Sequence, residues 1–354
     1  MKWILFFSAL FHLPTTLFGA DAVFSKDNHH VYLVQWEQHP PRKSGSCSLI
    51  DVNLEKRTCG GMDLRKTFGE SVVDITISNA GFVLCATKSA LWSYDPASGK
   101  CVKVIDAPKN TELVEVAYDP SQSIVLACCR GAHGQELCCL PKDGDKWISV
   151  YNRRAVSAQV EFPVFSGKGS LYFSCRGDLW AGALIAQTEP TVPALHAAGK
   201  EMPKPSEEWP SVCMAELAAC RYAPIAFLET QNTTSDSTGL HALAVGRHFV
   251  YGDYSRLYGG MSWGRLIRCD FPALGEEGKH TEMDISGGSE ADGQQAIKAL
   301  QSVKTIVEDN CLYLCGSRDG SVIFYFSRHE QKPFLIKEDG KPEPLEIKGL
   351  DDLM

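Results

Sequence analysis

Long hydrophobic runs are scarce in this sequence, and an excess of basic residues is absent. After the apolar run at residues 3–11, no stretch reaches the roughly 20 apolar residues that a membrane-spanning helix needs. Lysine and arginine number 35 against 43 aspartate and glutamate residues, which gives a net charge of −8. Nucleic acids and acidic membrane surfaces attract basic patches. We therefore expect no nucleic-acid partner and no transmembrane segment after the leader.

The sequence also lacks the contiguous motifs of common enzyme classes. It has no G-x-S-x-G nucleophile elbow, no H-E-x-x-H zinc helix, no P-loop, no dinucleotide-binding glycine pattern and no EF-hand loop. Its cysteines do not form the paired C-x-x-C knuckles of a structural zinc site. No metal or cofactor is therefore predicted. A catalytic site assembled from distant segments leaves no such motif, so these absences weaken an enzymatic function without excluding it.

Residues 1–22 have the composition of a secretory signal peptide. Lys2 precedes a short apolar run, and small residues follow, with cleavage expected after Ala20 or Ala22. An uncleaved anchor is the alternative, but His12 and Pro14 interrupt the run. We expect the chain to be exported to a periplasm or secreted.

Fourteen cysteines are present, and export favours the pairing of some of them. The sharpest candidates are Cys128, Cys129, Cys138 and Cys139, which fit a hairpin centred between residues 133 and 134. In that register Cys128 faces Cys139 and Cys129 faces Cys138, at the distance of directly opposed residues. The alternative is that cysteines in apolar strands are small buried hydrophobic residues.

The clearest internal repeat covers residues 72–104 and contains four short strand-like segments. Residues 73–78 alternate apolar and polar side chains, which is typical of a half-buried strand. Turn-forming residues at 79–81 and 95–99 separate apolar segments. Four antiparallel strands joined by tight turns form one blade of a β-propeller.

Parts of this unit recur along the chain. The pair Leu91 and Trp92 returns as Leu179 and Trp180, two periods later, and residues 310–315 open a last unit. A period of about 40–50 residues with four strands per period indicates a propeller. We therefore predict an all-β chain folded as a single β-propeller of four-stranded antiparallel blades.

Two segments carry a resemblance to known propellers. Residues 316–325, Gly-Ser-Arg-Asp-Gly-Ser-Val-Ile-Phe-Tyr, resemble the turn and strand of a WD-repeat blade. Residues 91–100 are similar to blades of bacterial quinoprotein-like propellers. As a pattern the resemblance covers most of the chain. It implies the propeller superfamily and no specific family within it.

Six units begin near residues 21, 72, 113, 158, 240 and 299, so we predict six blades within residues 23–340, with seven as the alternative. The proline-rich segment 186–238, with an expected short helix at 214–220, is either an insertion or a degenerate seventh blade. The polar residues 341–354 are expected to be a C-terminal extension.

The candidate ligand-binding residues are aromatic. Tyr251, Tyr254, Tyr258 and Trp263 surround a pair of glycines in an expected long loop. Aromatic rings on a loop of a rigid scaffold favour stacking against a glycan or peptide, whereas the alternative is that they cover the top of a blade.

Charged candidates for a channel or rim are fewer. Asp74 and Asp95 are the acidic candidates for a channel, and His29 with His30 for a rim or metal-binding pair. For all four the favoured interpretation is hydrogen bonding in turns and at strand ends.

Two functions follow from these features. The first is a non-catalytic, exported scaffold that holds an unknown protein or glycan partner on one propeller face, without a cofactor. The alternative is a propeller hydrolase or lyase, with or without a divalent cation, whose carboxylates and histidines converge in the central channel.

Overall fold

The computed structural model describes most of the repeating strands of the chain. The described residues are 22–34, 49–132, 134–150, 160–175, 178–183, 186–187, 214–215, 223–226, 238–258, 261–270, 303–338 and 340–350. Within these ranges the only helix is the short α1 (Arg65–Phe68), and no helix is long and apolar enough to cross a membrane.

Three four-stranded antiparallel sheets come from the first part of the chain, and each is built from strands that follow one another in sequence. Sheet 1 contains β1 (Ala22–Phe24), β2 (His30–Leu33), β3 (Leu49–Asn53) and β4 (Thr58–Met62). Sheet 2 contains β5 (Val72–Ile77), β6 (Val83–Thr87), β7 (Ala90–Asp95) and β8 (Lys100–Asp106). Sheet 3 contains β9 (Thr111–Asp119), β10 (Ile124–Gly131), β11 (Gly134–Leu140) and β12 (Ile148–Val150).

Three more four-stranded antiparallel sheets follow. Sheet 4 contains β13 (Glu161–Phe165), β14 (Ser170–Cys175), β15 (Asp178–Ala183) and β18 (Ala223–Ala226). Sheet 5 contains β19 (Thr238–Val245), β20 (Phe249–Tyr258), β21 (Met261–Asp270) and β22 (Lys304–Val307). Sheet 6 contains β23 (Cys311–Gly316), β24 (Val322–Ser327), β25 (Lys332–Lys337) and β26 (Glu343–Pro344). A separate two-stranded ladder joins β16 (Ala186–Gln187) and β17 (Met214–Ala215).

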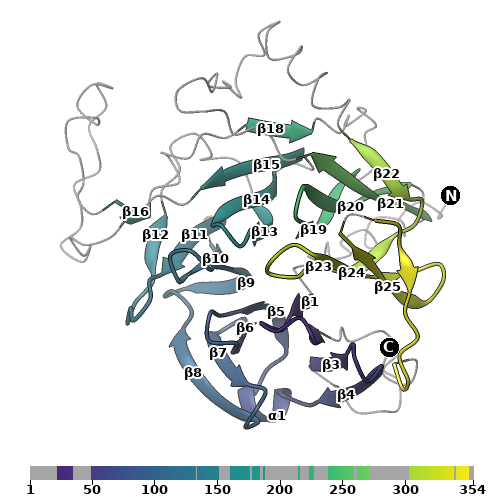
Figure 1. Ribbon diagram of the computed structural model, residues 1–354. Helices are drawn as coiled ribbons and strands as arrows, with labels where there is room; N and C mark the ends of the chain where they lie inside the picture. The colour runs from purple at the N-terminus through teal and green to yellow at the C-terminus, as the bar shows by residue number, and fades with distance from the viewer. Residues whose placement is uncertain are drawn as a thin grey trace, which may run out of the picture.

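The first strand of each sheet lies innermost, and these strands form a ring (Figure 1). Each of β1, β5, β9, β13, β19 and β23 contacts the first strand of the two neighbouring sheets, and the contact of β1 with β23 closes the ring. Radial antiparallel sheets around a common axis define a β-propeller. The all-β propeller predicted from the sequence is therefore confirmed.

The repeat predicted at residues 72–104 corresponds to β5–β8, whereas the segment 186–238 differs from its prediction. Its described residues supply β18, the outer strand of sheet 4, and form no four-stranded sheet of their own, so the seventh-blade alternative is wrong. Met214–Ala215 is a strand rather than the start of the expected helix. The last sheet starts at β23, later than expected, because β22 belongs to sheet 5.

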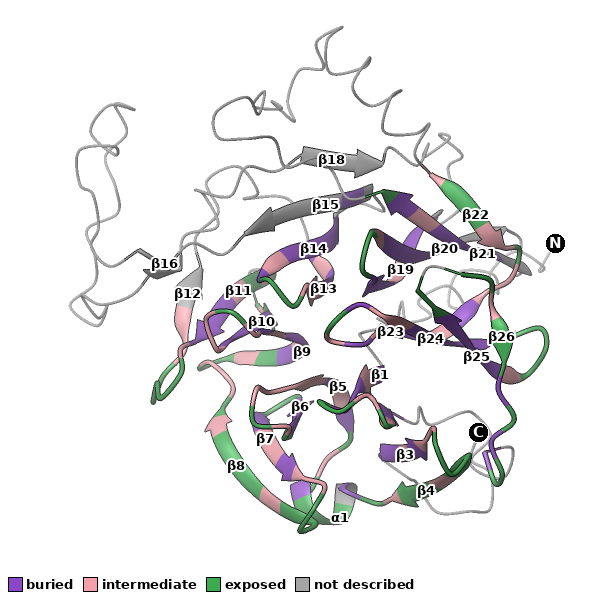
Figure 2. Ribbon diagram, in the orientation of Figure 1, coloured by how far each residue is buried: buried purple, intermediate pink, exposed green. Residues whose placement is uncertain are grey.

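The core lies between the sheets, and each of the six interfaces holds one apolar cluster (Figure 2). β6 has all five of its residues buried because it packs against neighbours on both faces. β8, on the outside of sheet 2, is mostly exposed. In sheet 2 burial therefore falls from β6 to the outer strand β8, as expected when the outer strand is not covered on both sides.

Three buried carboxylates link neighbouring sheets. Asp74 Oδ2 accepts a hydrogen bond of 2.6 Å from the N–H of Val116 on β9. Glu115 Oε2 accepts one of 2.9 Å from Phe162 N–H on β13, and Asp253 Oδ1 one of 3.1 Å from Cys311 N–H at the start of β23. Each donating strand (β9, β13 or β23) lies at the inner edge of its sheet, where some N–H groups have no strand partner. A carboxylate from the preceding sheet satisfies such groups.

The cysteine hairpin has a different register from the predicted one. Gly131 pairs with Gly134, so Cys128 faces Leu137 and Cys139 faces Leu126. The predicted register is therefore wrong, because the true pairing is shifted by two residues along one strand. Neither predicted cysteine pair, Cys128 with Cys139 or Cys129 with Cys138, is directly opposed. All four are thiols rather than disulfides in this structure. A hydrogen bond from the Cys138 thiol to the Cys129 sulfur, together with burial, raises the pKa of Cys138.

The chain end after β26 packs between sheets 6 and 1. Leu345, Ile347 and Leu350 are buried in the apolar cluster that these two sheets share. Lys348 N–H donates a 2.9 Å hydrogen bond to Arg57 O, and a parallel bridge joins Lys348 to Thr58. The end of the chain therefore supplements the side-chain packing that closes the ring.

Candidate functional site

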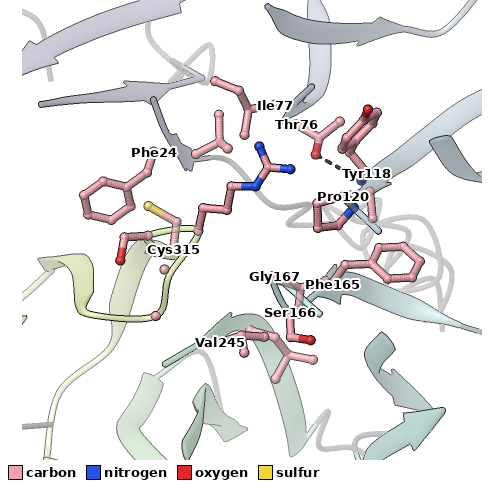
Figure 3. A pocket seen from close by; sticks show the side chains of 18 of the residues that line it. Phe24, Thr76, Ile77, Tyr118, Pro120, Phe165, Ser166, Gly167, Val245 and Cys315 are labelled. Atoms are coloured by element: carbon pink, nitrogen blue, oxygen red, sulfur yellow. Dashed lines mark hydrogen bonds between the residues drawn. The ribbon is translucent and has the colours of Figure 1, made fainter. Parts of the chain in front are cut away.

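A cavity of about 850 Å³ opens where the six innermost strands end (Figure 3). Its lining includes residues from the first strand of every sheet and from the turns that follow five of these strands. Because these strands are first in their sheets and contact one another side by side, their following turns gather at one end of the channel. The site is therefore the mouth of the propeller channel on this face.

Four of the six turns that follow the innermost strands share a sequence pattern of serine followed three residues later by glycine or asparagine. In each of four turns the N–H of the fourth residue donates to the serine carbonyl, over 2.8–3.1 Å; the pairs are Asn28 with Ser25, Gly81 with Ser78, Gly169 with Ser166 and Gly320 with Ser317. The fourth residue has a positive φ in every case. That backbone conformation suits glycine and asparagine best, which explains why these residues recur there.

The walls of the cavity are mainly apolar. Figure 3 shows Ile77, Phe165 and Val245 among the residues that surround the hollow. Thr76 Oγ1 accepts a hydrogen bond of 3.1 Å from Tyr118 N–H and is thereby satisfied. Burial raises the pKa of the lining residue Tyr172 to about 12, against a smaller opposing effect of Ser170, so its phenol stays neutral. The remaining apolar lining residues are Ala22, Val23, Phe24, Ile75, Val116, Ala117, Val164, Leu243 and Leu314.

Four cationic side chains belong to the same lining. They are Lys26, Lys168, Arg247 and Arg318, and they come from the first turns of sheets 1, 4, 5 and 6. Lys26, Lys168 and Arg247 are exposed and Arg318 is half-buried. Within the described residues none of the four forms a salt bridge.

Asp319 is the only carboxylate among the described residues of the lining, and its oxygen Oδ1 already accepts hydrogen bonds. It accepts hydrogen bonds of 2.8 Å from Ser317 Oγ, 2.8 Å from Ser321 Oγ and 3.1 Å from Ser321 N–H, and Asn28 Nδ2 adds one of 3.3 Å from sheet 1. Burial opposes ionisation of this group, but the hydrogen bonds from Ser321 and Ser317 together lower its pKa. Asp319 thus fixes the turn after β23.

The aromatic residues proposed from the sequence lie elsewhere. Tyr251 and Tyr254 are in β20, and the expected loop is instead the paired strands β20 and β21, which extend to Tyr258 and include Trp263. Tyr251 is 0% exposed and belongs to the core between sheets 5 and 6. Tyr251 and Tyr254, the two whose side chains the structure describes, do not line the cavity, and the side chains of Tyr258 and Trp263 lie outside the described residues.

The charged candidates form structural hydrogen bonds. Asp74 is buried between sheets 2 and 3, and Asp95 accepts hydrogen bonds from Ala97 N–H and Ser98 Oγ in its turn. His29 Nδ1 lies 2.9 Å from Glu55 Oε1, and His30 Nδ1 lies 2.7 Å from Asp51 Oδ1. In the described part of the chain no three His, Cys, Asp or Glu residues are grouped to hold a metal ion.

Sequence reasoning missed the four cations because each is a single residue in a separate turn. The signal that could have found three of them is the recurring turn from serine to glycine or asparagine, which carries a basic residue in the segments beginning at Ser25, Ser166 and Ser317. Only closure of the ring brings these turns to one mouth.

No family model and no curated protein matches the sequence. Among solved structures, the calcium-binding protein regucalcin from Agrobacterium tumefaciens is 11% identical with a TM-score of 0.50, over 93% of this chain and 94% of that chain. The Cps50 (Swd1) β-propeller domain from Myceliophteria thermophila is 7% identical with a TM-score of 0.45, over 90% of this chain and 97% of that one. The tricorn protease is 11% identical with a TM-score of 0.48, over 92% of this chain but only 31% of that chain.

Identities this low carry information about the fold alone. The closed ring of radial sheets, supported by the similarity to regucalcin, identifies the chain as a member of the β-propeller superfamily, without assigning it to a specific family.

Proposed function

We propose that the chain is an exported, non-catalytic propeller of six blades that binds a ligand in the channel mouth. The single observation that carries this proposal is the cavity of about 850 Å³ lined by all six innermost strands. Small-molecule sites are typically concavities of about 300–1,000 Å³ with apolar walls and a few polar groups. The mouth of this channel has both properties.

Export is supported by the composition of residues 1–22. Cleavage after Ala20 suits the fold better than cleavage after Ala22, because Ala22 is buried in β1 and pairs with Leu33. We therefore propose that the exported chain begins at Asp21.

The binding site proposed here differs from the aromatic group expected from the sequence. A fully buried Tyr251 offers no ring to a partner, and Tyr254, the other candidate whose side chain is described, is not part of the cavity. A protein or glycan partner on a propeller face stays compatible with this account if a protruding group of that partner enters the mouth.

The hydrolase or lyase alternative requires acidic groups and histidines that converge on a substrate. The part of the lining that the structure describes supplies one carboxylate, Asp319, whose Oδ1 holds the turn together, and no histidine. The lining therefore favours binding over acid–base catalysis.

A neutral fluorescent probe tests the site. N-phenyl-1-naphthylamine brightens in apolar surroundings, and we expect one saturable site per chain. Ile77→Trp adds bulk on the cavity wall and should weaken probe binding about tenfold or more, which corresponds to about 1.4 kcal/mol or more. The measurement is a fluorescence titration of each folded variant.

The matched control is Val102→Trp, which places the same ring on the outer strand β8, where Val102 is 50% exposed. This variant should bind the probe as the wild type does. A wild-type chain that shows no saturable site, or equal affinity in the Ile77→Trp variant, would contradict a ligand site in the channel mouth.

A further inference from the structure

We propose that the ligand of the channel mouth is an organic anion, with an apolar body and one acidic head held by Lys26, Lys168, Arg247 and Arg318. This inference rests on the proposed function and adds the chemical class of the ligand. Three observations carry it: the charge of the lining, the absence of counter-charges at these residues, and the contacts that hold their turns together.

The lining has the opposite charge to the chain as a whole. The chain has a net charge of −8, whereas the cavity lining contains four cations and one carboxylate. Charge of one sign in a cleft with apolar walls concentrates counter-ions, because the low-dielectric walls focus the field. The mouth therefore attracts anions to a protein that elsewhere repels them.

The four cations lack the partners that other lysines have. Lys66, Lys88, Lys103, Lys332 and Lys337 each form a salt bridge with an aspartate or glutamate. Within the described residues, none of the four cations at the mouth forms such a salt bridge. Asp319 Oδ1 accepts hydrogen bonds from hydroxyl, side-chain amide and backbone N–H donors instead. An incoming acidic group thus meets cations that no carboxylate of these ranges already neutralises.

Backbone contacts hold three of the cation-bearing turns against one another. A Cβ added to Gly167 would lie 2.6 Å from Arg318 O, so the turn carrying Lys168 touches the turn carrying Arg318. A Cβ added to Gly320 would likewise lie 2.6 Å from Arg247 N. These contacts are between sheets 4 and 6 and between sheets 5 and 6, and they need glycine because a side chain would collide with backbone.

The fourth cation is tied to the same group from sheet 1. Asn28, in the turn of Lys26, donates its 3.3 Å hydrogen bond to Asp319, which follows Arg318 directly. The four basic side chains therefore extend from connected turns. Arginine and lysine bind carboxylate, sulfonate and phosphate through charge-assisted hydrogen bonds, so these head groups share the required chemistry.

The apolar walls define the rest of the ligand. Ile77, Phe165 and Val245 line the same cavity of about 850 Å³ as the four cations, and this cavity suits the hydrocarbon body of a small molecule (Figure 3). A fully hydrated inorganic anion would leave these walls in contact with water. The combination selects an amphipathic anion.

Two dyes that differ by a single sulfonate test the inference. N-phenyl-1-naphthylamine is neutral, and 8-anilinonaphthalene-1-sulfonate carries the same rings with one negative charge. At low salt we expect the sulfonate to bind about tenfold more tightly than the neutral dye, since a charge pair at a protein surface contributes on the order of 1 kcal/mol or more. Arg318→Gln and Lys168→Gln should each weaken sulfonate binding about threefold or more and leave the neutral dye unaffected.

The control is Lys109→Gln, an exposed lysine that precedes β9 and so lies at the opposite end of that strand from the mouth. This variant should change the affinity for neither dye. One outcome would overturn the anion inference and leave the proposed function standing. In that outcome the neutral dye binds saturably, the sulfonate binds no more tightly, and neither Arg318→Gln nor Lys168→Gln changes the affinity for the sulfonate. Failure of both dyes to bind would overturn the proposed function and this inference with it.

Discussion

At the scale of single residues, buried carboxylates join the sheets through backbone N–H groups. Asp74, Glu115 and Asp253 each lie 5% exposed or less and accept from the first strand of the next sheet. A buried N–H without a partner costs about 1–3 kcal/mol, more than a satisfied hydrogen bond contributes. These residues therefore stabilise the spacing of the strands that line the channel.

The contribution of Asp74 can be measured with two substitutions. Asp74→Ala removes the acceptor of Val116 N–H and should lower the free energy of unfolding by about 1–3 kcal/mol. Asp74→Asn keeps a side chain of the same shape with one acceptor oxygen, so it should lower the free energy of unfolding by less. Urea unfolding of both variants checks this, and equal losses would show that the N–H acceptor is not the source of the stability.

Asp253 makes stability depend on pH. Burial raises its pKa to about 7; Cys311 N–H opposes this rise and Asp309 adds to it. In the unfolded chain the pKa is about 3.9, so the protonated group's contribution to stability is fully present below about pH 4. It is lost as the pH rises through about 7.

We expect the wild type to lose on the order of 3 kcal/mol between pH 5 and pH 8 relative to Asp253→Asn, which does not titrate. Urea unfolding of both proteins at the two pH values gives the difference. Parallel pH profiles would contradict a raised pKa at this position.

At the scale of elements, the chain end acts as a packing segment for ring closure. Exposed residues separate the three buried residues of this segment. The buried residues belong to the apolar cluster between sheets 1 and 6 and are Leu345, Ile347 and Leu350. In the described residues no strand of one of these sheets completes the other, so side-chain packing, together with the backbone bond from Lys348 to Arg57, joins the first sheet to the last. The last buried residues should therefore matter for the stability of the whole ring.

Ile347→Ala should lower the free energy of unfolding by about 2–4 kcal/mol, as other buried Ile-to-Ala changes do. Glu346→Ala, at the exposed neighbouring position, should have little effect. Thermal unfolding of both variants measures the difference. If Ile347→Ala loses no more stability than Glu346→Ala, the segment does not contribute to the stability of the ring.

Elements with a clean alternation and glycine turns could be predicted from the sequence, and β5–β8 are the example. β20 and β21 could not, because the glycine pair at residues 259–260 and the aromatic residues around it suggested a long loop. A Cβ at Gly252 would lie 2.6 Å from Leu240 Cδ2, so this glycine serves close packing inside a strand. The burial of Tyr251 between two sheets likewise depends on neighbours that are distant in sequence.

At the scale of the whole molecule, the ring assembles a site whose parts have no local signature. Lys26 and Arg318 lie near opposite ends of the chain, yet the contact of β1 with β23 brings their turns to one mouth. Local sequence could predict the turns but not their meeting, because that depends on the number of sheets and on closure. Clustered cations without salt bridges also repel one another when no ligand is bound.

This repulsion predicts a gain in stability when charge is removed. The double variant Lys168→Gln/Arg318→Gln, without ligand and at low salt, should melt about 1–2 °C above the wild type. In about 0.5 M sodium chloride the gain should disappear, since the Debye length falls to a few ångströms. A thermal melt at both salt concentrations measures it; a lower melting temperature at low salt would indicate that these side chains stabilise the free protein instead.

The account depends most directly on where a ligand sits. A crystal structure of the protein with 8-anilinonaphthalene-1-sulfonate locates the dye without assumptions about affinity. We predict its rings against Ile77, Phe165 and Val245, with the sulfonate within about 3–4 Å of at least two of the four cations. A dye bound elsewhere on the propeller, with the channel mouth holding only solvent, would contradict the claim that this mouth is the binding site.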